Sequence, residues 1–195
     1  MTLFFDICTG LGLAAAAGIR PFLPAVLTGL FALGDVGIDF DGTSFAFLES
    51  PVWIVGLAVL MVLTFVLGRR EEPGALDSAV GGLSLGIGAL LFAGTLADHG
   101  RDSAGWIALA VVAGIAVAAL GNASVRDLAA RTARRLDAAA RRALPLWFEG
   151  VGLALAAACI ALPPLAIVAI GFLVWLLLGG RKREGGKYAG LRVLR

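Results

Sequence analysis

The chain has 195 residues, of which 59% are apolar and only 15% carry a charge, and its mean hydropathy is +0.94. Soluble domains are about half apolar and a quarter charged, so this composition excludes an ordinary soluble protein and indicates an integral membrane protein. The length suits a single domain over residues 1–195, and the formal net charge of +2 is uninformative until the basic residues are located.

Five apolar runs follow one another, over residues 3–33, 51–67, 76–97, 104–120 and 146–178. The three middle runs have the length of single transmembrane helices, because about 17 to 25 residues cross the hydrocarbon core. The first and last runs are too long for one span, and each is interrupted near its centre: by Arg20, Pro21 and Pro24, and by Pro163 and Pro164. Proline removes a backbone donor and restricts the residue before it, so each long run is predicted to be a broken pair of helices.

Arg20 lies inside the first run, where an arginine costs at least about 2.5 to 3.5 kcal/mol on insertion scales. Two interpretations remain open. Either the first arm crosses fully and Arg20 reaches the far interface as a loop charge, or residues 18–24 form the tip of a re-entrant hairpin with an ion or anion site. Asp6 and Glu149 are candidate partners of this arginine. The candidate solute path comprises Arg20, Pro21, Pro24, Asp6, Glu149, Pro163 and Pro164, with Asp77 and Thr95 as further candidates flanking the third run.

The stretch "GLSLG", residues 82–86, matches the G-x-S-x-G pattern of serine nucleophiles. A serine needs a base, and the only histidine of the sequence, His99, would lie about 22 Å from Ser84 on a continuous helix. Gly82 and Gly86 also form a GxxxG pair, so we expect close helix packing here and no enzyme activity. His99 itself is expected to be a solvated loop residue.

Residues 122–144 are predicted to form an amphipathic helix on the membrane surface. Ser124 with Asp127 resembles a capping box at its start, and Pro145 would stop it. Its arginines share one half of the helical wheel, which suits contact with anionic lipid headgroups: Arg126, Arg131, Arg134, Arg135, Arg141 and Arg142. No aromatic residue is interleaved, so we do not expect a nucleic-acid partner.

The positions of the basic residues predict an orientation. Twelve of the 16 Lys and Arg residues lie in residues 122–144 and in the tail, 179–195. The positive-inside tendency puts both segments, and hence the C-terminus, on the cytoplasmic side of a bacterial inner membrane. Residues 146–178 would then enter and leave by the cytoplasmic face, and the acidic loop over residues 34–50 would be external. The side of the N-terminus stays open.

An internal repeat relates the two broken pairs. "GLGLAAAAGIRPFLP", residues 10–24, aligns without a gap with "GVGLALAAACIALPP", residues 150–164. Both carry small residues at four-residue spacing, which lets helices approach closely in a membrane: Gly10, Ala14, Gly18 and Gly150, Ala154, Ala158. If the repeat is real, the two pairs are inverted relative to each other. Chance identity between Ala- and Gly-rich segments is the alternative.

The chain resembles a known family at "GLGLAAAAGIRPFLPAVLTGL", at "SPVWIVGL" and at the tail "KYAGLRVLR". It resembles the small bacterial integral membrane proteins catalogued as domain of unknown function four-one-two-six. The likeness covers most of the chain and is most specific in the N-terminal stretch. It implies a membrane location and broken first and last helices, and it implies no substrate.

These observations predict an all-α polytopic transmembrane helical bundle. The broken pairs and intramembrane charges favour a transporter or channel-like protein for a small solute or ion. The alternative is a non-transporting scaffold or lipid-organising protein that acts through its basic segments. Expected partners are the lipid bilayer, anionic lipids at the cytoplasmic face and the small solute or ion, and the oligomeric state, a homo-oligomer included, stays open. Cys8 and Cys159 are expected to be buried hydrophobes, and no metal or cofactor is predicted.

Overall fold

A computed structural model describes residues 3–68 and 73–189, and the secondary structure of these residues is entirely helical. The predicted all-α class is therefore confirmed. The elements in chain order are α1 (Leu3–Ile19), α2 (Phe22–Leu33), the 3-10 helix η1 (Ala46–Glu49), α3 (Pro51–Leu67), α4 (Pro73–Asp98), α5 (Ala104–Ala133), α6 (Ala138–Ala161) and α7 (Leu165–Ala189).

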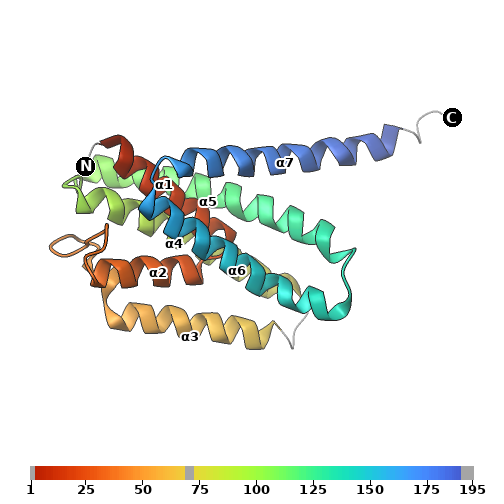
Figure 1. Cartoon of the computed structure of the whole chain (residues 1–195), viewed down its shortest axis with the longest axis horizontal. Coiled ribbons are helices and arrows are strands. Elements are labelled where there is room, and N and C mark those ends of the chain that lie inside the picture. The colour runs from red at the N-terminus through yellow and green to blue at the C-terminus, as the bar shows by residue number, and fades with distance from the viewer. Residues whose placement is uncertain (1–2, 69–72, 190–195) are drawn as a thin grey trace.

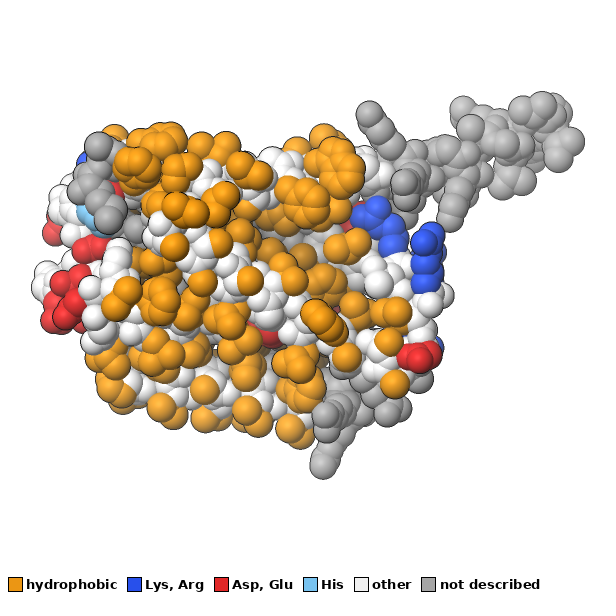
Figure 2. All heavy atoms as spheres, in the orientation of Figure 1, with side chains coloured by type: hydrophobic (Ala, Val, Ile, Leu, Met, Phe, Trp, Pro, Cys, Tyr) orange, Lys and Arg blue, Asp and Glu red, His pale blue; other side chains and the backbone are white. Residues whose placement is uncertain are grey.

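Three of the described helices are long and apolar enough to cross a membrane: Leu76–Asp98, Ala104–Ala133 and Ala139–Ala161. The other apolar helical segments are shorter, with 17 residues or fewer: α1, α2, α3 and the part of α7 over Leu165–Gly179. Large apolar side chains face outward on several helices, among them Val52, Val112 and Trp175. They form a hydrophobic surface over much of the molecule (Figure 2). A surface of this kind is expected next to lipid and is rare next to water.

The helices run between two ends of opposite character (Figure 1). The acidic end carries residues 34–50 and 98–103, and the basic end carries the turn at residues 134–137. Acidic side chains gather at the first end and arginines at the second, with the hydrophobic surface between them (Figure 2). Helices α3 to α7 alternate in direction between these two ends.

The first two helices form a hairpin that begins and ends at the acidic end (Figure 1). The hairpin turns at Arg20 and Pro21, between the last residue of α1 and the first of α2. The α6–α7 turn, residues 162–164, faces the other way, toward the acidic end. A Cβ built on Gly37 of the acidic loop would lie 3.3 Å from Ile160, which places the last turn of α6 against that loop.

Helix α1 is the central element of the bundle, because it packs against α4, α5, α6 and α7. Its inward residues are small, so neighbouring backbones come close. A Cβ on Gly18 would clash with the backbone of Ala118 in α5, and one on Gly121 would lie 2.9 Å from the carbonyl oxygen of Ala15. Nearer the start of α1, a Cβ on Gly10 would collide with the ring of Phe92 in α4.

The predicted surface helix over residues 122–144 is wrong as a separate element. Its first half continues α5 to Ala133, and its second half is the start of α6. Helix α5 continues through Gly121, where a glycine is suited because a Cβ would come too close to the α1 backbone. The residue that caps the start of α6 is Asp137, whose side chain accepts a hydrogen bond from the Ala140 N–H at 2.7 Å. Pro145 lies inside α6 and does not end it.

The small-residue spacing predicts the packing of α1 correctly and that of two other segments wrongly. Gly82 and Gly86 of α4 have no atom within 4 Å of a built Cβ, so they are not a packing motif. Gly150 of α6 is equally open, and α6 instead buries Gly152 and Cys159 against α1. Ser124, predicted to cap a helix, donates hydrogen bonds to the carbonyl oxygens of Leu120 and Leu173: 2.8 and 3.0 Å.

Gly18→Val is expected to lower the free energy of unfolding by about 1–3 kcal/mol, because its side chain meets a backbone that cannot move aside. Gly86→Val is the matched control, since a Cβ at Gly86 meets nothing within 4 Å. The measurement is the melting temperature of the purified protein in detergent. Equal losses in the two variants would contradict the packing described for α1.

Candidate functional site

The tip of the α1–α2 hairpin is built around a helix start that lies inside the protein. The Arg20 N–H still donates to the carbonyl oxygen of Ala16, at 3.1 Å, and Pro21 then precedes α2 without a capping side chain. The first N–H groups of a helix need partners from outside the helix. Glu149 of α6 supplies one, because its Oε2 accepts a hydrogen bond from the Leu23 N–H at 3.1 Å.

Glu149 is buried, with 7% of its surface exposed. A carboxylate is well placed at a helix N-terminus, where the helix dipole and the free N–H groups both favour negative charge. Arg20 lies close enough for its opposite charge to attract Glu149. Glu149 therefore ties α6 to the hairpin tip across a sequence separation of 126 residues.

The side chain of Arg20 is the unusual feature of this tip. Its Nε is buried and has no hydrogen-bond partner. Among the described residues, no ion pair or side-chain hydrogen bond of Arg20 is formed with a neighbour. A cation held this way inside an apolar protein is costly unless it faces water or an anion. The space around it decides what it can contact.

One space next to Arg20 is a cavity of about 700 Å³ near the basic end, here called the basic cavity. Its walls come from the hairpin tip, α4, α5 and α6. The charged and polar residues that line it are Arg20, Asp77, Ser78, Ser84, Asn122, Arg126 and Arg141. Arg126 also donates a hydrogen bond to the carbonyl oxygen of Asp77, which fixes this guanidinium across the cavity wall. Three arginines and one aspartate make this wall suited to an anion.

A second space, here called the side pocket, has a volume of about 260 Å³ and lies between α3, α4 and α6. It is lined mainly by apolar residues, including Met61, Val62, Phe65 and Leu146. Arg20, Asp77 and Val80 line both the side pocket and the basic cavity. Glu149 lines the side pocket only. The Arg20 site is thus reached from two directions of different polarity.

The structure brings together some of the predicted path residues and separates others. Arg20, Pro21, Pro24, Glu149 and Asp77 lie at or near the hairpin tip. Pro163 and Pro164 lie at the α6–α7 turn, about 20 Å from Glu149 along α6, and are not part of the tip. Thr95 is buried near the acidic end, where it donates to the carbonyl oxygen of Leu91 at 2.8 Å.

The prediction that Asp6 partners Arg20 is wrong. Asp6 lies about 20 Å from Arg20 along α1, at the acidic end. Its partners are Arg101, with Nη1 2.7 Å from Oδ2, and His99, with Nε2 3.5 Å from Oδ1. His99 is therefore not a free loop residue, and its Nδ1 lies 3.4 Å from Oδ2 of Asp98. These ion pairs hold the loop after α4 against the first turns of α1. The sequence of neither segment predicts this contact.

The arginines predicted to contact lipid headgroups have different surroundings in the part of the chain that the structure describes. Arg126 and Arg141 line the basic cavity. Arg131 pairs with Asp127 at 2.9 Å, one turn earlier on α5. Arg134 and Arg135 are exposed at the turn between α5 and α6. The side chain of Arg142 and those of the basic tail lie outside the described residues.

Ser84 and the two cysteines occupy ordinary packing positions. The Ser84 hydroxyl donates to the carbonyl oxygen of Val80 at 2.9 Å, and His99 lies beyond the other end of α4. Cys8 and Cys159 are free thiols, both buried, and they share a small apolar cluster with Ala166.

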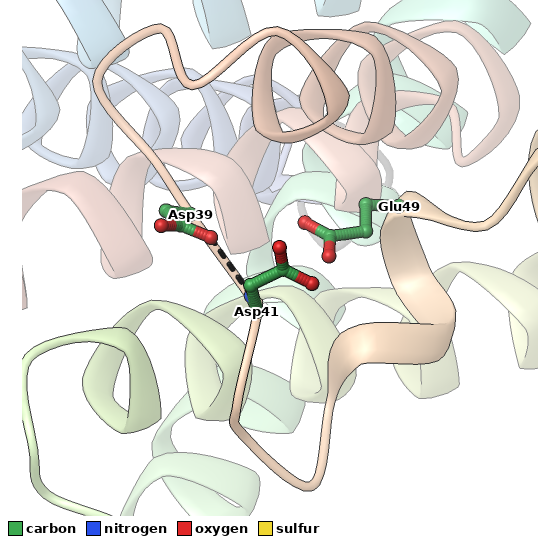
Figure 3. A group of neighbouring side chains, drawn as sticks. All are labelled: Asp39, Asp41 and Glu49. Atoms are coloured by element: carbon green, nitrogen blue, oxygen red, sulfur yellow. Dashed lines mark hydrogen bonds between the residues drawn. The ribbon is translucent and has the colours of Figure 1, made fainter.

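Three carboxylates meet in the loop at the acidic end (Figure 3). Oxygen atoms of Asp39, Asp41 and Glu49 all lie within 4.8 Å of one another, and the Phe40 N–H donates to Glu49 at 3.2 Å. Burial raises the pKa of the Glu49 carboxyl above its ordinary 4.5, and a hydrogen bond to Asp41 adds to this shift. Sequence reasoning identified the loop as acidic and missed this convergence, because it depends on how η1 folds back.

Comparison with family models, with curated proteins and with solved structures finds no match to this chain.

Glu149→Ala is expected to lower the free energy of unfolding by about 1–2 kcal/mol, because the Leu23 N–H loses its partner. Glu149→Gln is the matched control, since its amide oxygen can still accept that hydrogen bond. The measurement is the melting temperature of both variants in detergent. If Glu149→Gln loses as much stability as Glu149→Ala, the capping role assigned to Glu149 is wrong.

The contribution of the Glu49 carboxyl to the free energy of unfolding should fall as the pH rises. A carboxyl whose pKa is raised by folding stabilises the fold fully below its ordinary pKa of 4.5, and this contribution is lost as the pH rises through the raised value. Glu49→Gln should flatten the dependence of melting temperature on pH above 4.5, and Asp35→Asn, outside the trio, should leave it unchanged. An unaltered pH profile in Glu49→Gln would contradict this.

Proposed function

We propose that this chain is a transporter or channel-like protein that takes up an anionic solute or ion at Arg20. The observation that carries the proposal is a guanidinium without a fixed protein partner, held at the tip of a buried hairpin and facing a cavity with two further arginines. Helical hairpins that end inside a membrane protein supply the backbone and charged groups from which transport sites are built.

The orientation proposed for the chain puts the basic end in the cytoplasm of a bacterial inner membrane. Exposed arginines at the turn over residues 134–137 support this, because cytoplasmic segments are enriched in Lys and Arg. The hairpin of α1 and α2 then enters from the external side, and α3 to α7 cross in alternating directions. The α1–α2 and α6–α7 pairs point in opposite directions (Figure 1), which supports the proposed inverted repeat.

The second candidate is a non-transporting membrane protein that organises lipids or partners at its basic end. Arg134 and Arg135 favour it, because both are exposed where lipid headgroups would lie. The two candidates differ in the accessibility of the basic cavity. A transport path must open to both faces of the membrane, whereas a scaffold leaves the cavity open to one face.

Cysteine accessibility of the basic cavity separates the two candidates. The variant Asn122→Cys, in a chain with Cys8→Ala and Cys159→Ala, retains Arg20 and places a thiol in the cavity wall. Membrane-impermeant thiosulfonates are added to vesicles of known sidedness. Transport predicts modification from both faces, while Thr43→Cys and Arg135→Cys, at the two ends, each react from one face only.

The same variant tests the charge preference of the cavity. A thiosulfonate that carries a sulfonate should react with Asn122→Cys faster than one that carries a trimethylammonium group, because three arginines line the wall. Adding Arg20→Gln should narrow this difference, and adding Arg134→Gln should not. Modification from the basic end alone would favour the scaffold, and a preference for the cationic reagent would remove the case for an anion.

A further inference from the structure

We propose that the ligand bound at Arg20 is a lipid with a phosphate headgroup. The phosphate group of this lipid occupies the basic cavity, and its hydrocarbon chain occupies the side pocket. This inference rests on the proposed function, because it names the chemical class of ligand for the same site. It follows from the junction of a basic cavity and an apolar pocket at a single arginine.

The basic cavity has the chemistry of a phosphate site. Guanidinium groups bind phosphate oxygens through paired N–H donors, and Arg20, Arg126 and Arg141 approach the cavity from three different elements. Asp77 is the one carboxylate among the described lining residues, so the wall keeps an excess of positive charge. A volume of about 700 Å³ accommodates a headgroup together with water.

The side pocket adds a feature that a soluble anion does not need. It lies between α3 and α6, and two of its lining residues, Val62 and Leu146, are each 57% exposed. Exposed apolar side chains on these helices face the bilayer, so the pocket is open toward lipid. A hydrocarbon chain in this pocket would contact its apolar residues, among them Met61, Phe65 and Leu146.

Arg20 connects the two spaces, because it lines both, together with Asp77 and Val80. A molecule whose anionic head contacts Arg20 in the basic cavity can therefore extend its tail between α3, α4 and α6. A small soluble anion would occupy the basic cavity alone. The paired spaces thus favour an amphiphile that enters sideways from the membrane.

The test measures the melting temperature of the protein in detergent as ligand is added. Phosphatidic acid, phosphatidylcholine and inorganic phosphate are compared. Phosphatidic acid is expected to raise the melting temperature, and Arg20→Gln should weaken its binding by about tenfold or more, because one charged hydrogen-bond donor is lost. Val62→Trp fills the side pocket and should also weaken binding. Val59→Trp, exposed on the same helix outside the pocket, is the matched control.

Each outcome decides the inference. A response to phosphatidic acid alone that requires Arg20 and an open side pocket supports it. Equal responses to inorganic phosphate and phosphatidic acid, unaffected by Val62→Trp, would show a soluble anion at Arg20 and overturn the lipid assignment while leaving the proposed function intact. No response to either phosphate compound would overturn the lipid assignment, while the accessibility of Asn122→Cys decides the proposed function separately. A phosphatidic acid response that survives Arg20→Gln would place the lipid elsewhere and also overturn the inference.

Discussion

The close approach of α1 to its neighbours is the constraint on which the rest of the structure depends. Glycines and alanines line α1, and glycines of α5 face it, so four helices pack directly around one short helix. This packing holds the end of α1 inside the bundle. The turn at Arg20 and Pro21 is consequently enclosed by α4, α5 and α6, and Glu149 of α6 becomes available to cap the first turn of α2.

The same packing explains how a charged residue is tolerated at the hairpin tip. Glu149 is committed to the N–H of Leu23, so it offsets the charge of Arg20 without pairing with it directly. The guanidinium is left facing the basic cavity, where water or an anion can satisfy it. At the start of α1, Asp6 pairs with Arg101 through Oδ2 at 2.7 Å, whereas Arg20, which follows the end of α1, has no such partner among the described residues. Asp6 joins two segments of the bundle, and Arg20 is the residue at which we propose ligand binding.

The sequence predicts the features that depend on composition and local breaks, and it misses those that depend on distant contacts. The helical class follows from apolar runs, and Arg20 and Glu149 are identified because charges are rare within such runs. Asp6 is assigned the wrong partner, since nothing local shows that the loop with Arg101 returns to α1. The helix start at Asp137 is missed because proline is the stronger helix-breaking signal in the sequence, and it places the predicted boundary at Pro145. Gly82 and Gly86 fit a packing motif, yet α3 stands apart from them.

The hairpin of α1 and α2 is the central claim, and the sidedness of its two ends tests it most directly. Single-cysteine variants Leu3→Cys and Leu33→Cys, made without Cys8 and Cys159, place thiols at the exposed start of α1 and end of α2. A membrane-impermeant thiol reagent should modify both from the face that carries residues 34–50 and neither from the other face. Modification of the two positions from opposite faces would show that the first run crosses the membrane, and it would remove the buried tip at Arg20.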